Sequence, residues 1–144
     1  PDDLEEMTFS QDPFALIVGR RNDHLPSELS LRDMGAMRWV LPEARGAFRR
    51  QIDALFMAAD VPVPQDAIRC DSLLTTKAMV RNSSRLTILP MKVAAAELSI
   101  GVLRAIAIRE ATFQRSIGIR KLKDARLSRL GEALLDIMIH SSKL

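Results

Sequence analysis

The sequence has few of the residues that mark disulfide-bonded, membrane-spanning or base-stacking proteins. It contains one cysteine, Cys70, so no intramolecular disulfide can form and a reducing compartment is favoured. Aromatic residues make up only 4% of the chain, so the core must be aliphatic and platforms for stacked bases are not expected. No apolar run approaches 18 residues, and residues 1–6 are acidic. We therefore expect a cytoplasmic protein that does not contact a membrane.

Recognisable catalytic and metal-binding motifs are also missing. The sequence has no glycine-rich phosphate-binding loop, no nucleophile elbow and no cysteine–histidine cluster with metal-ligand spacing. Neither His24 nor His140 is placed to activate Cys70, and a thiol at the end of a buried strand is usually a small core residue. We expect no catalytic residue, no metal site and no cofactor.

The charge is weakly basic and dispersed. The net charge of +3 arises from 21 basic and 18 acidic side chains. Only Arg20–Arg21, Arg49–Arg50 and residues 115–123 form basic clusters. A nucleic-acid-binding module usually concentrates its charge on one face, so we do not expect this chain itself to bind DNA.

Short apolar runs alternate with segments of helical periodicity. The clearest helix is predicted over Ala47–Ala59, where Phe48, Ile52, Leu55 and Phe56 form one apolar stripe and Arg49 and Asp53 face outward. Strands are predicted at residues 14–18, 38–41, 67–70, 85–89, 102–108 and 113–121, and further helices at residues 30–34, 71–80, 91–98 and from 127 onward. In the short helix Ser30 can act as the cap and Asp33 as its reciprocal partner. This alternation predicts an α/β fold with a mainly parallel sheet and flanking helices.

Three strand-to-helix junctions are the candidate ligand site. Because the carboxyl ends of parallel strands meet at one edge of a sheet, these junctions should lie together. Free helix N–H groups, hydroxyls and a guanidinium suit a small anionic or polyhydroxylated ligand. The candidate residues are Pro42, Glu43, Ala44, Arg45, Asp71, Ser72, Thr75, Leu89 and Pro90.

Each of the three junctions also has a purely structural interpretation. Asp71 or Ser72 can serve as a helix N-cap without any ligand. Arg45 can be an ordinary solvated loop residue, and Pro42 and Pro90 can simply end strands. Only their convergence on one edge favours the functional interpretation.

The order of the segments resembles the carboxyl-terminal regulatory region of LysR-type transcriptional regulators, which has the type 2 periplasmic-binding-protein fold. The resemblance extends over nearly all of residues 12–140. The matching stretches are Asp12–Val18, Leu29–Met34, Arg38–Pro42, Arg49–Pro64, Asp71–Val80, Leu86–Pro90, Gly101–Leu103, Ile117–Arg120 and the segment from Leu127. It implies an effector-sensing domain composed of a remnant of subdomain one with the crossover (1–13), subdomain two (14–106), and the return to subdomain one (107–144).

Two departures from the family pattern are visible. His24-Leu25-Pro26 replaces a common His-Pro-Leu, and Asn82-Ser83-Ser84-Arg85 replaces a glycine-rich turn. We expect Asn82 to supply the left-handed conformation that the turn needs. The second departure is similar to a branch whose regulators control sugar-binding-protein genes, which points to a sugar-like effector.

The resemblance also implies partners. A small metabolite would bind between two subdomains, DNA would be bound only through a winged helix-turn-helix that this chain lacks, and the parent protein would be a homo-oligomer. The last strand and helix should expose an apolar face, so the chain alone should associate or be partly disordered at its end. It should also bind effector weakly. A solute-binding protein of a transport system on the same fold is the alternative, and a small α/β enzyme is a third possibility.

Overall fold

The computed structural model describes residues 3–110, 114–124 and 126–141, and the chain divides into two units. One unit comprises residues 1–12 and 114–144, and the other comprises residues 13–113. The division at residues 1–13, 14–106 and 107–144 stays a prediction for the subdomains.

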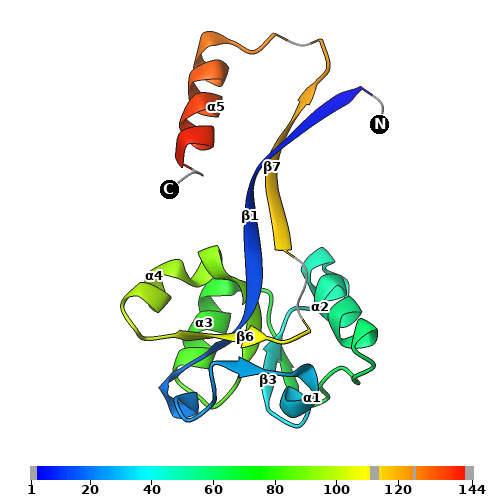
Figure 1. Ribbon diagram of the computed structural model, residues 1–144, viewed down its shortest axis with the longest axis vertical. Coiled ribbons are helices and arrows are strands. Elements are labelled where there is room, and N and C mark those ends of the chain that lie inside the picture. Colours follow the sequence, from blue (N-terminus) through cyan, green and yellow to red (C-terminus); the bar gives the residue numbers. More distant parts are fainter. Residues whose placement is uncertain (1–2, 111–113, 125, 142–144) are drawn as a thin grey trace. The chain divides into compact units, whose positions relative to one another are not determined.

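Strands and helices alternate along most of the chain, as the sequence predicts (Figure 1). Among the helices within the described ranges, none is long and apolar enough to cross a membrane. The elements are β1 (Leu4–Val18), η1 (Arg20–Asn22), β2 (Glu28–Leu29), α1 (Leu31–Met34), β3 (Trp39–Leu41), α2 (Ala47–Ala58), β4 (Ala67–Arg69), α3 (Leu73–Arg81), β5 (Thr87–Pro90), η2 (Met91–Ala94), α4 (Ala95–Ser99), β6 (Arg104–Ile108), β7 (Gln114–Leu122) and α5 (Arg129–Ser141), where η denotes a 3-10 helix.

The smaller unit contains the beginning of β1, β7 and α5. Strand β7 pairs with β1, and the Lys123 N–H donates to the Asp3 carbonyl over 2.9 Å. The predicted strand over residues 113–121 is confirmed from Gln114 onward, and Phe113 lies outside the described residues. No described residue of α5 is buried, and Leu130, Leu134 and Ile137 are 80%, 57% and 63% exposed. The predicted apolar face of the last helix is therefore present.

The larger unit is built on a sheet in the order β2-β6-β1-β5. Strand β1 is antiparallel to β5, with Leu16 opposite Ile88, and antiparallel to β6, with Leu16 opposite Ile106. Strands β3 and β4 pair in parallel, and a parallel bridge from Trp39 to Leu86 places β3 beside the start of β5.

The strand directions agree with the predicted fold class. The α/β fold with a mainly parallel sheet is confirmed, because β2 is parallel to β6 and β3 is parallel to β4 and to the start of β5. Strand β1 is the exception, since it runs opposite to its neighbours β5 and β6. The apolar run Phe14–Val18 indicates burial on both faces of a sheet, and such burial does not depend on strand direction.

The core of the larger unit lies on both faces of its sheet. Leu16 and Val18 pack in one cluster with residues of α1 and α2, whereas Ala15 and Ile17 pack in a second cluster with Val80 of α3. Alternate side chains of a strand point to opposite faces, so β1 contributes to both clusters. In the first cluster Trp39 is fully buried, and its indole N–H donates to the Met34 carbonyl over 3.1 Å.

Helix α1 is held by two sets of side-chain bonds at its beginning. Ser30 and Asp33 form the predicted reciprocal capping box. In addition, the Glu110 carboxylate accepts a hydrogen bond from the Leu31 N–H over 2.9 Å, although the two residues are 79 positions apart. The segment that follows β6 is thereby bonded to the start of α1.

Helix α2 ends in a left-handed turn. Asp60 has φ of +54°, its N–H donates to Met57, and the Val61 N–H donates to Phe56. These two bonds form a Schellman motif, in which glycine is the preferred left-handed residue. Val61 packs against the same core cluster that contains Phe56, which completes the motif.

The turn between α3 and β5 differs from the prediction. Asn82 has φ of −103°, and no residue of 82–85 is left-handed. The turn is stabilised instead by side chains, because the Asn82 amide donates to Ala78 and the Ser83 hydroxyl donates to Met79. The Ser83 oxygen also accepts from the Arg85 N–H. Local side-chain bonds thus replace the conformational freedom of glycine.

Candidate functional site

The three predicted junctions follow strands that run in the same direction. Strands β3 and β4 are parallel, and the bridge from Trp39 to Leu86 aligns β3 with the segment that becomes β5. The carboxyl ends of the three strands therefore point the same way. We call the residues that follow β3 and β4, namely 42–46 and 70–72, the β3–β4 edge.

The first junction is an exposed turn that leads into α2. Pro42 is half-buried, whereas Glu43, Ala44 and Arg45 are exposed. The Gly46 N–H donates to the Glu43 carbonyl over 3.2 Å, and Gly46 caps α2 without any side-chain hydrogen bond. The first N–H groups of α2 thus have no side-chain acceptor from the cap, and this end of the helix favours negative charge.

A hydrogen bond joins the first junction to the second. The Asp71 carboxylate accepts from the Glu43 N–H over 2.9 Å. Ser72 is the N-cap of α3, and its hydroxyl oxygen accepts from the Thr75 N–H over 3.2 Å. Of the two capping interpretations, the one for Ser72 is confirmed, and Asp71 instead fixes the neighbouring turn.

Arg49 has a role that the sequence analysis missed. Its side chain is only 12% exposed, and the guanidinium donates to the Pro42 carbonyl and to Asp53, each over 2.8 Å. The prediction that Arg49 simply faces outward is wrong, because its guanidinium is bonded to the backbone of the turn after β3 and is largely buried there. The i, i+4 spacing of Arg49 and Asp53 was the only available signal.

The third junction offers little polarity. Leu89 is 4% exposed and pairs with Ala15, and Pro90 is buried opposite Phe14. The side chain of Leu89 belongs to the second core cluster. Leu89 and Pro90 therefore support the sheet end rather than present groups for hydrogen bonding.

The polar groups of the β3–β4 edge can accommodate a small polar ligand. The side chains of Glu43 and Arg45 are exposed and make no hydrogen bond or ion pair with the described part of the chain. Beside them are the uncapped start of α2 and the hydroxyl groups of Ser72 and Thr75. This set suits anionic or hydroxyl-bearing molecules.

Cys70 lies at the same edge, directly after β4. The thiol is free and half-buried, and its sulfur lies 3.5 Å from the Ser72 carbonyl oxygen. Cys70 also packs against the second core cluster, as expected for a small core residue.

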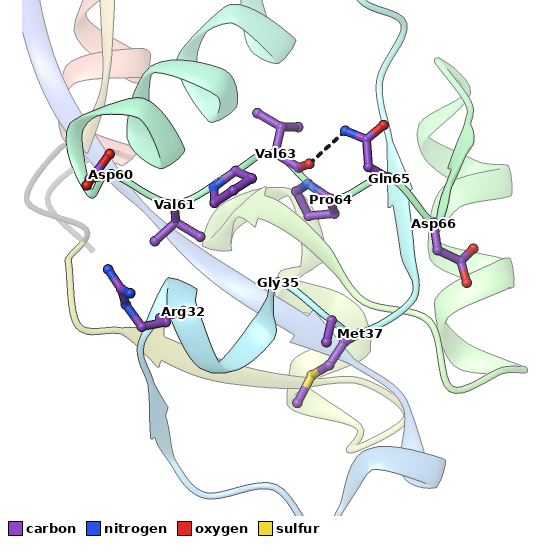
Figure 2. Close-up of a pocket in the computed structure, with 11 residues that line it drawn as sticks. Arg32, Gly35, Met37, Asp60, Val61, Val63, Pro64, Gln65 and Asp66 are labelled. Atoms are coloured by element: carbon purple, nitrogen blue, oxygen red, sulfur yellow. Dashed lines mark hydrogen bonds between the residues drawn. The ribbon is translucent and has the colours of Figure 1, made fainter.

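Two cavities of the larger unit lie away from the predicted residues. One of about 420 Å³ is bordered by the turn after α1 and the loop between α2 and β4 (Figure 2). The other, of about 280 Å³, is lined by residues that include Arg49, Asp53 and Arg69. None of the nine candidate residues lines either cavity. Both cavities depend on loop conformations that periodicity does not specify.

Solved structures of regulatory domains share this fold. The regulatory domain of CcmR from Synechocystis PCC6803, in complex with 2-PG, has a TM-score of 0.80 at 19% identity, covering 98% of this chain and 68% of that one. The effector-binding domain of QuiR in complex with shikimate has a TM-score of 0.74 at 17% identity, covering 99% and 66%. Full-length CbnR complexed with its target DNA has a TM-score of 0.75 at 19% identity, covering 100% and 48%.

The chain spans about two thirds of the two regulatory domains and about half of full-length CbnR. No curated protein sequence matches it. The model of the LysR substrate binding domain, however, matches residues 1–142. The chain therefore belongs to the family of LysR substrate-binding domains, which are the effector-binding regulatory domains of LysR-type transcriptional regulators.

Proposed function

We propose that the chain senses a small metabolite for a transcriptional regulator, and that the β3–β4 edge forms one wall of the effector site. The observation that carries this proposal is the hydrogen bond from the Glu43 N–H to Asp71, because it joins two strand-to-helix junctions into one surface. Ligands of open α/β sheets bind at such an edge. The candidate contacts are Pro42, Glu43, Ala44, Arg45, Asp71, Ser72 and Thr75, with Leu89 and Pro90 behind them.

The effector that we propose is small and either anionic or sugar-like. The uncapped start of α2, the Arg45 guanidinium and the hydroxyls of Ser72 and Thr75 are all hydrogen-bond donors available at the edge. Related domains have been solved with 2-PG and with shikimate. Such a ligand would change transcription by binding one arrangement of the regulator more tightly than another.

The remaining parts of the proposal concern DNA contact, assembly and location. CbnR binds its target DNA as a full-length regulator, of which this chain spans 48%. We propose that DNA contact is made outside residues 1–144, that the regulator is a homo-oligomer in the cytoplasm, and that the chain binds its effector without transforming it. The single cysteine supports a reducing compartment.

The proposal can be tested by titrating the labelled chain with shikimate and with 2-PG while amide NMR shifts are recorded. We expect saturable shifts concentrated at Glu43–Ala47 and Asp71–Thr75 for at least one of the two compounds. The affinity should be low, because only part of the related domains is present. Shifts concentrated on another part of the chain would contradict the assignment of this edge.

Two variants distinguish specific contact with the ligand from nonspecific attraction by positive charge. Arg45→Gln removes an exposed cation at the edge and should weaken about tenfold the binding of whichever of the two compounds binds, because each carries an anionic group and a charged hydrogen bond contributes roughly 1.5–3 kcal/mol. Arg21→Gln removes an exposed cation elsewhere and should leave binding unchanged. Equal losses in both variants would indicate nonspecific attraction by the basic surface.

A further inference from the structure

The larger cavity lies at the opposite end of the strands from the β3–β4 edge. Its walls are Gly35–Met37, which precede β3, and Asp60–Asp66, which precede β4 (Figure 2). The effector candidates follow the same two strands. A volume of about 420 Å³ lies within the range of about 300–1,000 Å³ that is usual for small-molecule sites. The cavity is thus a separate place from the proposed effector site.

The cavity has an apolar floor. Met37, Val61 and Val63 line it, and all three are half-buried because they pack against the first core cluster. Pro62 and Pro64 add further apolar surface. A ligand with an aliphatic body could cover these side chains and remove apolar area from water.

Two opposite charges border this floor without neutralising each other. The charged lining residues are Arg32, Asp60 and Asp66. Asp66 is paired with Arg38 at 3.1 Å and with Arg85 at 3.3 Å. Arg32 and Asp60 are exposed and form no ion pair with each other or with other described residues. Figure 2 shows both side chains toward the same end of the cavity. A ligand there would meet one free cation and one free anion.

The end of α2 strengthens the preference for a cation beside Asp60. Asp60 directly follows the capping residue Ala59, and the last turn of α2 carries no basic side chain. The carboxyl end of a helix bears partial negative charge, which here lacks the usual basic partner. An ammonium group near Asp60 would therefore interact with both the carboxylate and the helix end.

The cavity walls are held in place by hydrogen bonds that do not involve the free charges. The Val61 N–H donates to the Phe56 carbonyl over 3.0 Å, and the Trp39 N–H donates to the Asp66 backbone carbonyl over 2.9 Å. The Gln65 amide donates to the Val63 carbonyl over 3.1 Å, drawn as a dashed line in Figure 2. Two prolines further restrict the loop. Such a prebuilt site loses little conformational entropy when it binds a ligand.

From these features we propose that the cavity binds a free apolar amino acid as its zwitterion. The carboxylate would pair with Arg32, the ammonium group with Asp60 and the end of α2, and the aliphatic side chain would cover Met37 and Val61. This would give the domain a second small-molecule site, distinct from the β3–β4 edge.

The test uses L-leucine as the probe and amide NMR shifts of the labelled chain as the readout. We expect saturable shifts at Ala36, Met37, Val61, Val63 and Gln65, with no comparable change at Glu43 or Asp71. Three matched compounds each lack one element: 4-methylpentanoate lacks the ammonium group, 3-methylbutylamine lacks the carboxylate, and glycine lacks the aliphatic body. Each should bind at least about tenfold more weakly than leucine.

Two variants test whether Arg32 and Asp60 contact the charged groups of leucine. Arg32→Gln and Asp60→Asn should each raise the Kd for leucine at least about tenfold, whereas Arg21→Gln, at a residue outside the cavity, should not change it. Asparagine tolerates the left-handed backbone of residue 60, so Asp60→Asn preserves the turn. Absence of saturable shifts up to the solubility limit of leucine would overturn the proposal. So would equal binding of 4-methylpentanoate, or an unchanged Kd in both cavity variants.

Discussion

At Gly19 the neighbouring backbone leaves no room for a side chain. A Cβ atom at this position would lie 2.5 Å from the Val80 carbonyl oxygen and 2.9 Å from that of Arg81. Because both atoms belong to the backbone of α3, neither can move independently. We expect Gly19→Ala to lower the free energy of unfolding by roughly 1–3 kcal/mol, the usual range for overpacking.

Urea denaturation followed by circular dichroism measures this change. Gly35→Ala is the matched control, since its Cβ would have no neighbour closer than 3.8 Å and its φ is −60°. Equal stability of Gly19→Ala and the wild type would show that α3 can withdraw from β1.

Asp60 shows the opposite situation, in which glycine would suit the backbone better. Its φ of +54° is a left-handed conformation that costs free energy for a residue with a Cβ atom. Asp60→Gly should raise the free energy of unfolding by up to about 1 kcal/mol. Thermal unfolding followed by circular dichroism measures this gain. Asp23→Gly, at φ of −61°, is the control and should not raise the free energy of unfolding. If leucine binds in the cavity, the glycine variant should be more stable yet bind it less well.

At the scale of elements, the capping box at the start of α1 makes the stability of the folded chain depend on pH. The Ser30 hydroxyl bond, followed by the Ser30 backbone bond, lowers the pKa of Asp33 below its ordinary value of 3.8. A lowered pKa stabilises the folded chain above the ordinary value, and this stabilisation is lost as the pH falls through the folded pKa. The cap therefore weakens only in acid.

Ser30→Ala should raise the pKa of Asp33 toward its ordinary value, because the largest cause of the shift is removed. Carboxyl carbon NMR shifts recorded between neutral and acidic pH measure this pKa directly. An unchanged pKa in the variant would assign the shift to other groups, such as Arg109. Glu97, whose pKa is lowered by Lys77, serves as an internal reference that Ser30→Ala should not affect.

The positions of most helices and strands could be predicted because the spacing of apolar residues follows which side chains are buried. The helix at Ala47–Ala58 and the capping box at Ser30 follow the predicted pattern closely. The reversed direction of β1 and its full length were not predictable, since neither alters which side chains are buried. The bond from Glu43 to Asp71 joins residues 28 positions apart and leaves no local signal. The predicted site residues stay a prediction, and the cavity beside Val61 depends on loop geometry alone.

At the scale of the whole molecule, α5 carries an apolar face without cover among the described residues. Leu130, Leu134 and Ile137 lie at helical spacing and are all more than half exposed. Exposed apolar patches of this kind promote association. We expect the 144-residue chain to self-associate as its concentration rises, and the double variant Leu130→Lys with Ile137→Lys to remain monomeric.

Light scattering coupled to size-exclusion chromatography distinguishes these outcomes. Replacing the exposed Met57 of α2 by lysine is the control, because that residue is a single exposed apolar side chain on another helix. Monomeric wild-type chain at high concentration, together with slow hydrogen exchange throughout α5, would contradict the prediction.

The bond between Glu110 and Leu31 has a consequence for the chain during its synthesis. The first N–H group of α1 has no carboxylate partner until Glu110 is synthesised, 79 residues after Leu31. Strand β6, which pairs with both β1 and β2, is synthesised only just before Glu110. A nascent chain that ends before β6 lacks the strand that lies between β1 and β2. The larger unit can therefore complete its fold only after residue 110 has left the ribosome, and until then one edge of β1 stays open to other chains.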